Sequence, residues 1–447
     1  MPMNSEASSP TAVIVGLGYV GLTLGVALAQ RGCRVIGLEK REDVVDLTNA
    51  GKPHFSETGL DRAMSKVVEN GNFIACTALD PALEAGYYVI TVGTPLIAGS
   101  TKPRIDMIEQ ASRQVADHMR DGASVTLRST VKLGTARDVV RPILAESGKS
   151  FHLAMCPERT LEGAALKELA ELPQIVSGET AEAADKAAAL FGLLTPAVVR
   201  VSDLETAEMI KLIDNTSRDV RFAFANEVAR ACDAVGIDAG EVIRSGKFEY
   251  PRTDVALPGL VGGPCLEKDP HILMASLAET GTALEITRAC RLVNERQPEE
   301  TVNAIVARLV ERGKGPFRVA IAGMAFKGRP ETDDLRGSMS LKVIDALQAR
   351  DEIGSIVTYD GVVAREDIDA LGLDIEVADD LVSACDGAHA LIIANNHPEY
   401  SDLDIDSCVD AMNDGGFIYD YWAHLVKRPP ATLEGRYFVV GNNRGRF

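Results

Sequence analysis

A glycine-rich turn between a short apolar run and a longer apolar segment limits the possible folds of this chain more than any other feature. The segment Val13 to Gly21 places Gly16, Gly18 and Gly21 in the pattern G-x-G-x-x-G directly after a predicted strand. The first glycine permits a tight turn, the second lets a pyrophosphate approach the backbone, and the third allows close packing of helix on strand. An ordinary glycine-rich turn is the alternative, but the context favours a dinucleotide-binding βαβ unit.

An acidic residue stands where the next predicted strand ends. Glu39 follows the apolar run Arg34 to Leu38, and a carboxylate at that place accepts hydrogen bonds from a ribose diol and repels a 2′-phosphate. The sequence therefore favours NAD over NADP as the cofactor, although Lys40 and Arg41 next to Glu39 weaken that preference.

From Thr11 to Val201, short apolar runs alternate with longer periodic segments, which predicts βαβ units and a parallel sheet. The predicted strands are Ala12 to Val15, Arg34 to Leu38, Phe73 to Cys76, Tyr87 to Thr91, Ser124 to Leu127 and Phe151 to Cys156, with weaker candidates at Gln174 to Ser177 and Ala197 to Val201. We therefore expect a Rossmann-like NAD-binding domain over residues 1–201.

The middle of the chain reads as helical. No Gly or Pro occurs from Asp203 to Val235, so a single helix of about 50 Å is expected there, long enough to bridge two domains and to offer a dimerisation face. Further helical segments are expected near His271 to Glu279 and Leu284 to Glu295, and Arg312 to Pro316 reads as a linker. We assign residues 202–312 to a helical central domain.

A second α/β pattern begins after the linker. Its predicted strands are Arg318 to Gly323, Ser355 to Asp360, Ala388 to Ala394, Phe417 to Tyr421 and Tyr437 to Val440. We assign residues 313–447 to a smaller nucleotide-binding domain. The predicted fold class is α/β, with two Rossmann-like doubly wound parallel-sheet domains joined by a helical middle domain.

Composition narrows the classes of function. The 447 residues contain 65 acidic and 46 basic side chains, a formal net charge of −19, which makes nucleic acid an unexpected partner. Eight cysteines without a C-x-x-C pair indicate neither a disulfide framework nor a metal site, so we expect no metal and a cytoplasmic location. Met1 to Pro10 lacks the features of a signal peptide, and no apolar stretch is long enough to span a membrane.

One cysteine stands in a setting that suits a nucleophile. Cys265 lies in the glycine-rich segment Gly262 to Pro270, just before a predicted helix. Asp269 as a helix cap followed by Pro270 is the plainer interpretation. A positive helix end and a neighbouring lysine would, however, favour the nucleophilic thiolate. Cys156 is the only serious rival, and the other six cysteines read as packing residues.

Two further clusters carry charge. Glu208, Lys211 and Asn215 share one face of the long predicted helix, where they are either a solvated ion pair or, if that face lines a cleft, donors for a developing oxyanion. In the last domain, lysine and arginine occur in the segments 323–328 and 332–338 after the first strand. They suit a phosphate group or belong to an irregular surface loop.

Taken in order, the motifs resemble the UDP-glucose/GDP-mannose dehydrogenase family over nearly the whole chain. The motifs are Gly16 to Gly21, Gly93-Thr94-Pro95, Ser129-Thr130-Val131, Pro157-Glu158 with Glu162-Gly163, Glu208 with Lys211 and Asn215, Gly262 to Cys265 with Lys268-Asp269, and Phe326-Lys327 with Asp333-Asp334 and Arg336.

The resemblance implies a four-electron oxidation of the C6 alcohol of a nucleotide sugar to a carboxylate, with two NAD+ reduced. Cys265 would form a thiohemiacetal with the intermediate aldehyde and then a thioester. Lys211 and Asn215 would stabilise the oxyanion, and Asp269 would assist proton transfer. Glu158 would help thioester hydrolysis, and Thr130 would orient a water molecule.

The resemblance also implies the binding residues. Cofactor contacts are expected from Gly16, Gly18, Tyr19, Val20, Gly21, Glu39, Thr94, Thr130 and Arg336. Substrate contacts are expected from Arg159, Leu161, Glu162, Lys211, Asn215, Arg252, Gly262 and Lys327. The arginine that matches Arg252 reaches the sugar of a neighbouring subunit in the family, which implies a homodimer with a shared substrate site.

The chain is more similar to the branch that acts on UDP-N-acetylhexosamines, with UDP-N-acetylmannosamine as the first candidate, in the stretches Cys156 to Gly163 and Tyr250 to Arg252. The alternatives are UDP-N-acetylglucosamine or UDP-glucose as substrate, a two-electron β-hydroxyacid dehydrogenase, and a non-catalytic sensor of nucleotide sugars. A two-electron enzyme or a sensor has no need for a thiol such as Cys265 at the reacting carbon.

Overall fold

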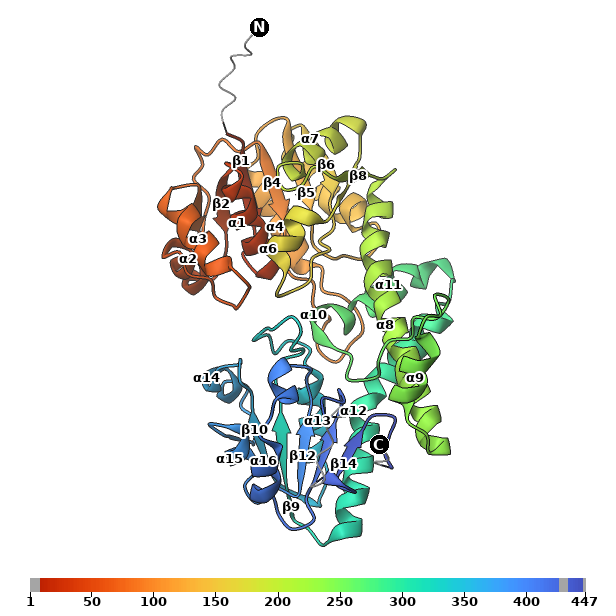
Figure 1. Ribbon diagram of the computed structural model, residues 1–447. Coiled ribbons are helices and arrows are strands. Elements are labelled where there is room, and N and C mark those ends of the chain that lie inside the picture. The colour runs from red at the N-terminus through yellow and green to blue at the C-terminus, as the bar shows by residue number, and fades with distance from the viewer. Residues whose placement is uncertain (1–8, 426–432, 445–447) are drawn as a thin grey trace. The chain divides into compact units, whose positions relative to one another are not determined.

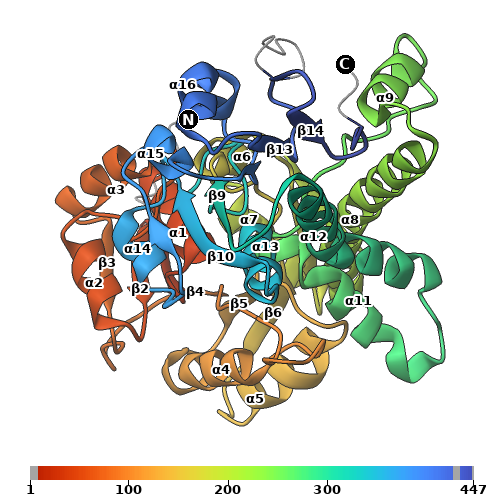
Figure 2. The ribbon, with the colours of Figure 1, turned by 90° about the horizontal axis from the view of Figure 1, so that it is seen from below.

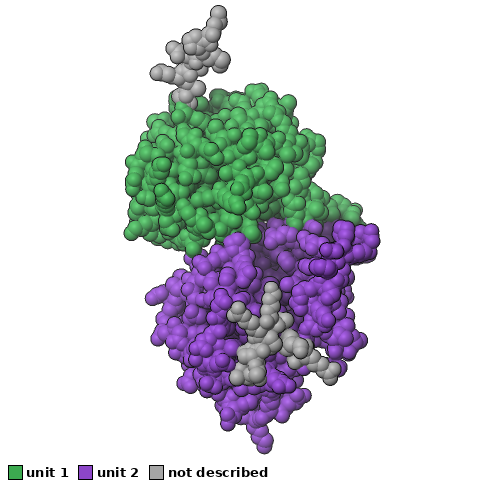
Figure 3. Space-filling model, viewed as in Figure 1, with its two compact units in different colours: residues 1–214, 271–282 green, residues 215–270, 283–447 purple. Residues whose placement is uncertain are grey.

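The computed structural model describes residues 9–425 and 433–444. Most of the N-terminal stretch from Met1, on which the expectation of no signal peptide rests, lies outside the described residues. The chain separates into two compact units, coloured separately in Figure 3. Unit 1 contains residues 1–214 and 271–282, and unit 2 contains residues 215–270 and 283–447. The predicted central domain, 202–312, is thus shared between the units, and the three-part division stays a prediction.

Unit 1 is built on an eight-stranded sheet with the order β3-β2-β1-β4-β5-β6-β7-β8 (Figure 1). Its strands are β1 (Thr11–Val15), β2 (Arg34–Leu38), β3 (Phe73–Cys76), β4 (Tyr87–Ile90), β5 (Ala123–Leu127), β6 (Phe151–Met155), β7 (Gln174–Gly178) and β8 (Val198–Arg200). The apolar runs form strands because both faces of a parallel sheet are covered by helices. The predicted strands are confirmed to within two residues at each end.

Helices cover both faces of this sheet. They are α1 (Tyr19–Gln30), α2 (Glu42–Asn49), α3 (Leu60–Glu69), α4 (Asp106–His118), a π-helical turn η1 (Ala136–Val140), α5 (Arg141–Ala145), α6 (Ala165–Glu171) and α7 (Ala181–Phe191). Apolar side chains of α1, α3 and α7 form one core, and those of α4 and α5, together with Leu204 and Ala207, form the other. Helices α4 and α5 lie side by side (Figure 2).

The expectation of a fully parallel sheet in unit 1 is wrong at one edge. β7 pairs antiparallel with β6 through Ala154 and Gly178, and β8 then runs parallel to β7. The first six strands keep the doubly wound order 3-2-1-4-5-6. The reversed pair therefore extends the sheet without altering the carboxyl ends of β1 and β4, where this fold binds dinucleotides.

The helical middle begins with α8 (Leu204–Val235), the long helix that the sequence predicts. It is followed by α9 (Ala239–Lys247), α10 (Gly263–Leu266), α11 (Asp269–Leu277), η2 (Ala278–Thr280) and α12 (Glu285–Arg312). Leu204 and Ala207 pack into the core of unit 1, and Ala229 and Cys232 pack into that of unit 2. Helix α8 therefore belongs to both units.

Unit 2 carries a parallel six-stranded sheet with the order β11-β10-β9-β12-β13-β14, the same 3-2-1-4-5-6 arrangement. Its strands are β9 (Phe317–Ala322), β10 (Ile353–Tyr359), β11 (Glu376–Val377), β12 (Ala390–Ile393), β13 (Phe417–Asp420) and β14 (Tyr437–Val439), and its further helices are α13 (Met339–Gln348), α14 (Arg365–Asp369), α15 (Leu381–Cys385), η3 (Pro398–Ser401) and α16 (Ile405–Ala411). One face packs on α12 and α13 and the other on α15 and α16. The predicted fold class is confirmed.

No helix in the described part of the chain is long and apolar enough to cross a membrane. Across residues 9–425 and 433–444, no group of three His, Cys, Asp or Glu side chains is arranged to hold a metal ion.

Candidate active site

The glycine turn after β1 has the geometry that its sequence predicts. Gly16 adopts a φ of +92°, which favours glycine, and its carbonyl oxygen lies 2.7 Å from the Thr91 hydroxyl. A Cβ on Gly21 would lie 1.9 Å from the Gly16 oxygen, whereas a Cβ on Gly18 would meet no atom within 4 Å. The turn thus leaves open space at Gly18, directly before the N-terminus of α1. A helix N-terminus with an exposed backbone suits a pyrophosphate.

Glu39 lies at the end of β2, beside this turn. Its Oε2 accepts the N–H of Leu17 at 2.9 Å, and its Oε1 accepts the N–H of Arg41 at 3.1 Å. The Arg41 guanidinium is paired with Asp43, so its charge is largely offset, and Lys40 is exposed. Glu39 therefore presents a carboxylate at the edge of the cofactor turn, which fits a ribose diol better than a 2′-phosphate.

Two of the predicted site residues of unit 1 meet at the carboxyl ends of β4 and β5. The Thr94 hydroxyl donates a hydrogen bond to the Thr130 carbonyl oxygen. The neighbouring Ser129 hydroxyl donates to the carbonyl oxygen of Val92 at 2.6 Å. These bonds join the two loops and fix the Thr130 backbone close to the glycine turn of the same sheet.

Glu158 is buried and fully occupied by donors. Its Oε2 accepts the Nε–H of Arg128 at 2.9 Å and forms an ion pair with Arg128 Nη2 at 2.7 Å, and its Oε1 accepts the N–H groups of Arg159 and Thr160, both at 2.7 Å. Burial opposes ionisation, yet the charge of Arg128, the Thr160 N–H and the charge of Lys211 hold the pKa of Glu158 at about 2. Glu158 is therefore a permanent anion at ordinary pH.

Arg128 is a residue that the sequence-based prediction missed. It is 1% exposed, and besides Glu158 it contacts the carbonyl oxygen and thiol of Cys156 and the side chain of Gln174. The sequence does contain a signal for Arg128, namely a charged residue directly after the apolar strand β5. Burial raises the pKa of the Cys156 thiol to about 12, so this rival nucleophile stays protonated.

The segment after Glu158 contains the predicted substrate residues of unit 1. Arg159 forms an ion pair with Asp214 of α8 at 3.4 Å. The N–H of Leu161 donates to Glu168 at 2.6 Å, and Glu162 is half-buried. Lys211, one turn before Asp214 on α8, is buried. The charge of Lys211 acts on Glu158, so Lys211 lies close to this segment.

In unit 2, Cys265 lies on the short helix α10 and is partly exposed. The segment before it is fixed to the loop that follows β9. The N–H of Gly263 donates to the Gly337 carbonyl oxygen at 2.7 Å, and a Cβ on Gly263 would lie 2.4 Å from the Phe326 ring. A Cβ on Gly262 would lie 2.4 Å from the Gly337 oxygen. Only glycine permits this approach, so the sequence holds Cys265 against the last domain.

Asp269 begins α11 and is completely buried. Its carboxylate accepts hydrogen bonds from the Asn215 amide and the Lys268 ammonium group, both at 2.5 Å. Asn215, on α8, is itself 5% exposed. The structure thus joins the predicted residues Asn215 and Asp269 in one buried cluster, and Lys268 neutralises the carboxylate.

The remaining predicted residues of unit 2 lie on loops. Lys327 is half-buried, with its Nζ 5.2 Å from the centre of the Phe326 ring. Arg336 is exposed and pairs with Asp334 at 2.6 Å. Arg252 is also exposed and stacks over the Tyr250 ring at 4.5 Å.

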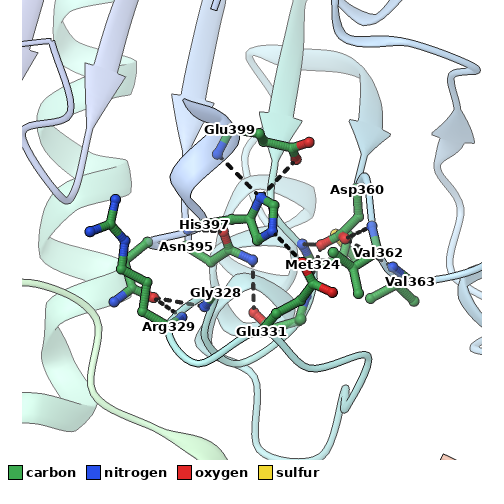
Figure 4. A network of polar contacts seen from close by, with 12 residues as sticks. Met324, Gly328, Arg329, Glu331, Asp360, Val362, Val363, Asn395, His397 and Glu399 are labelled. Carbon is green, nitrogen blue, oxygen red and sulfur yellow. Dashed lines mark hydrogen bonds and ion pairs between the residues drawn. The ribbon is translucent and has the colours of Figure 1, made fainter. Parts of the chain in front are cut away.

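A polar network that the sequence did not predict holds the loop carrying Lys327 (Figure 4). Asp360, at the end of β10, accepts the N–H groups of Met324 at 2.6 Å and of Val362 at 2.8 Å. The Asn396 side chain accepts the N–H of Gly328 at 2.7 Å. The sequence does contain a signal for Asp360, namely an acidic residue at the end of the second strand of a sheet, as at Glu39. This loop lies at the carboxyl ends of β9 and β12, where the sheet order reverses and nucleotides bind.

Comparison with known proteins agrees with this arrangement. Models of the UDP-glucose/GDP-mannose dehydrogenase family match residues 11–194 as the NAD-binding domain, 205–296 as the central domain and 320–427 as the UDP-binding domain. The UDP-N-acetyl-D-mannosamine dehydrogenase of Pyrococcus horikoshii is 31% identical over 424 residues, 93% of this chain and 96% of that protein. An NDP-N-acetyl-D-galactosaminuronic acid dehydrogenase of Ralstonia nicotianae is 31% identical over 89% of this chain and 93% of that protein.

Solved structures show the same likeness. The UDP-N-acetyl-D-mannosamine dehydrogenase structure from Pyrococcus horikoshii has a TM-score of 0.87 and 30% identity, covering 97% of this chain and all of that chain. A UDP-glucose dehydrogenase from Pyrobaculum islandicum has a TM-score of 0.85 and 25% identity, covering 99% of this chain and all of that one. The chain therefore belongs to the UDP-glucose/GDP-mannose dehydrogenase family and is an NAD-dependent UDP-sugar 6-dehydrogenase.

Proposed function

We propose that this enzyme oxidises the C6 alcohol of a UDP-N-acetylhexosamine, with UDP-N-acetylmannosamine as the first candidate, to the uronate. The observation that carries the proposal is the buried carboxylate of Asp269, which is bound to Asn215 of α8 and to Lys268 and comes soon after the short helix bearing Cys265 in sequence. A binding protein has no use for a thiol in this glycine-rich segment followed in sequence by a buried carboxylate. Several relatives are named as UDP-N-acetyl-D-mannosamine dehydrogenases, which supports the choice of sugar.

The cofactor turn fits NAD. Open space at Gly18 and the N-terminus of α1 suit the pyrophosphate, and Glu39 suits the adenosine ribose. NAD+ supplies the acceptor for one hydride in each of two oxidations. We assign the further cofactor contacts to Tyr19, Val20, Thr94, Thr130 and Arg336.

The two oxidations are joined by a covalent intermediate. Oxidation of the C6 alcohol gives an aldehyde and releases a proton to water, and a bound NAD+ would accept the hydride. The Cys265 thiolate then adds to C6, and the resulting oxyanion is stabilised by Lys211 and Asn215, which share one face of α8. Loss of a second hydride gives a thioester. Water adds to C6 and the carbon–sulfur bond breaks, releasing the carboxylate and the thiol.

Proton movement in the last step falls to Asp269, whose carboxylate is already the acceptor for two side chains. Glu158 supports hydrolysis in another way. Its three accepted hydrogen bonds, its ion pair with Arg128 and its pKa of about 2 leave it little tendency to take a proton. Glu158 instead holds the backbone of Arg159 and Thr160 and supplies a fixed negative charge near Lys211. Thr130 orients a water molecule near the reacting carbon.

Recognition of the sugar is assigned to Arg159, Leu161 and Glu162 in unit 1 and to Gly262 in unit 2, and Lys327 binds the nucleotide. Arg252 is exposed on its own subunit. We infer that it completes the site of a second copy in a homodimer. Light scattering gives the mass of Arg252→Ala and of wild type, and activity is measured on the same samples. The two measurements together separate a loss of the dimer from a loss of the sugar contact.

The test is a panel of UDP-N-acetylmannosamine, UDP-N-acetylglucosamine, UDP-glucose and GDP-mannose with NAD+. The NADH formed per sugar consumed is recorded. Two NADH per molecule of an acetylated UDP-sugar is the expected result. Cys265→Ser should abolish the second oxidation, whereas Cys290→Ser, a partly exposed cysteine on α12, should not.

Other outcomes distinguish the alternatives. Preference for UDP-glucose would move the enzyme to the glucose branch, which the likeness to the Pyrobaculum islandicum enzyme favours. One NADH per sugar would indicate a two-electron dehydrogenase. Binding without turnover of any sugar would indicate a sensor of nucleotide sugars, and full turnover by Cys265→Ser would contradict the covalent intermediate.

A further inference from the structure

Glu57 is a buried carboxylate that the mechanism above does not use. It lies between α2 and α3, is 5% exposed and is far in sequence from every group that it binds. Its Oε2 accepts the hydroxyl of Tyr19 and the N–H of Gly163 at 2.7 Å. Its Oε1 accepts the N–H of Ala165 at 2.9 Å. The carboxylate therefore accepts internal hydrogen bonds and is not a solvated surface charge.

The groups that Glu57 holds come from two different functional segments. Tyr19 is the first residue of α1, next to the open space at Gly18 that suits the pyrophosphate. Gly163 directly follows Leu161 and Glu162, which are assigned to the sugar, and it adopts a φ of +87° that favours glycine. The two segments are separated by 144 residues, yet the Gly163 N–H also lies 3.1 Å from the Tyr19 hydroxyl.

Tyr19 is held by ring packing as well as by its hydrogen bond to Glu57. The Tyr19 ring packs on Phe55, two residues before Glu57, with the ring centres 5.1 Å apart. Burial, followed by the hydrogen bond to Glu57, raises the pKa of Tyr19, so its hydroxyl always donates. A shift of the first turn of α1 therefore moves an acceptor on which Gly163 and Ala165 also depend. An unpaired buried N–H is unfavourable, so the sugar segment has to follow.

We propose that Glu57 is a positioning residue that couples the cofactor turn to the sugar-binding segment, so that binding at one raises the affinity at the other. This inference rests on the proposed function, because it takes the segment around Leu161 as the sugar site. Linkage requires the effect to be equal in both directions. Glu57 itself touches no reacting atom.

The experiment is calorimetric titration of the intact enzyme with the tightest-binding UDP-sugar of the panel, with and without saturating NADH. NADH prevents turnover, so only binding is measured. For wild type we expect the dissociation constant of the sugar to fall about five- to tenfold when NADH is present. For Glu57→Gln, whose amide would place a donor against the N–H donors, we expect a factor near one.

Tyr19→Phe keeps the ring on Phe55 and leaves Glu57 bound to Gly163 and Ala165, so it removes the link without removing the anchor. It should lose the coupling while retaining a melting temperature close to wild type. The double variant should behave like Glu57→Gln alone. The matched control is Glu69→Gln, an exposed carboxylate on α3 that accepts a hydrogen bond from the Ser65 hydroxyl.

An unchanged coupling factor in Glu57→Gln or Tyr19→Phe would overturn the proposal, as would a wild-type enzyme without coupling. A failure of the proposed function looks different. In that case no acetylated UDP-sugar yields two NADH, although the binding titrations can still be carried out.

Discussion

The backbone N–H of Gly263 donates a 2.7 Å hydrogen bond to the carbonyl oxygen of Gly337, which joins the segment before Cys265 to the loop of the UDP-binding domain. The thiol and the nucleotide loop therefore share one compact unit. A change at this junction should disturb the position of Cys265 relative to a bound nucleotide sugar without touching either one.

Gly263→Ala tests this junction. A Cβ there would lie 2.4 Å from the Phe326 ring, and the φ of +89° adds a strain of about 1–2 kcal/mol for alanine. We expect turnover to fall by about a hundredfold, because small displacements of a reacting group cost that much. The measurement is steady-state formation of NADH.

Gly281→Ala is the matched control for Gly263→Ala. It has a similar φ of +74°, but a Cβ there would meet no atom within 4 Å. Gly281→Ala should carry a similar backbone strain, which lowers the free energy of unfolding, and should keep its activity. Equal losses of activity in the two variants would contradict a specific role for the Gly263–Gly337 junction.

Glu208 makes the stability of unit 1 depend on pH. It is 1% exposed, and its carboxylate accepts the N–H groups of Gly134 at 2.6 Å and Ala136 at 2.9 Å. Burial raises its pKa from 4.5 to about 7 in the folded state, although these N–H groups oppose the shift. Between pH 4.5 and 7 the folded state binds more protons than the unfolded state, so stability falls as the pH rises.

The predicted loss is complete above pH 7 and amounts to roughly 3 kcal/mol relative to pH 4.5, since each pKa unit corresponds to about 1.4 kcal/mol. Urea unfolding of wild type and Glu208→Gln from pH 4.5 to 8 measures this loss. It is the difference between the two proteins in how steeply the free energy of unfolding falls with pH. Glu205→Gln, one turn earlier and paired with Arg137 at the surface, is the control. Parallel curves for wild type and Glu208→Gln would show that Glu208 titrates normally.

The strands could be predicted from the sequence because each is a short continuous apolar run bounded by turn residues. The direction of β7 could not, because an apolar run looks the same in either direction. Helix α12 was expected to end near Glu295, before Pro298, yet it continues to Arg312. Its second half buries Val302 and Ile305, and this packing outweighs the hydrogen bond that proline removes.

The site was predictable where chemistry lies in a local motif, as at Gly16 or Cys265. It was not predictable where partners are distant in sequence. Arg128 and Glu158 are 30 residues apart and meet only because β5 and β6 are neighbours. Glu57 has no local motif around it, and its partners come from segments that only the folded sheet brings together.

The two cysteines weighed as nucleophiles should differ in reactivity. Cys265 is partly exposed, whereas Cys156 is buried beside Arg128 and its thiol stays protonated. Brief treatment with iodoacetamide at pH 8 should therefore alkylate Cys265 and inactivate the enzyme, and a bound UDP-sugar should protect it. Peptide mass spectrometry identifies the modified residue. Alkylation of Cys156 in step with inactivation would reverse the assignment.

The buried pair of Arg128 and Glu158 gives the last prediction. The pKa of Glu158 is lowered from 4.5 to about 2, so its contribution to stability is present above pH 4.5 and is lost only as the pH falls toward 2. Between pH 5 and 9 Glu158 should add no step to the pH profile of activity.

Arg128→Met leaves this carboxylate buried without its ion partner, which should lower the free energy of unfolding in urea by about 3–5 kcal/mol. Arg128→Met with Glu158→Gln removes the uncompensated charge and should recover part of that loss, because the penalty comes from the charge rather than from the missing pair. A double variant less stable than Arg128→Met alone would show that packing of Glu158, and not its charge, holds the segment at Arg159.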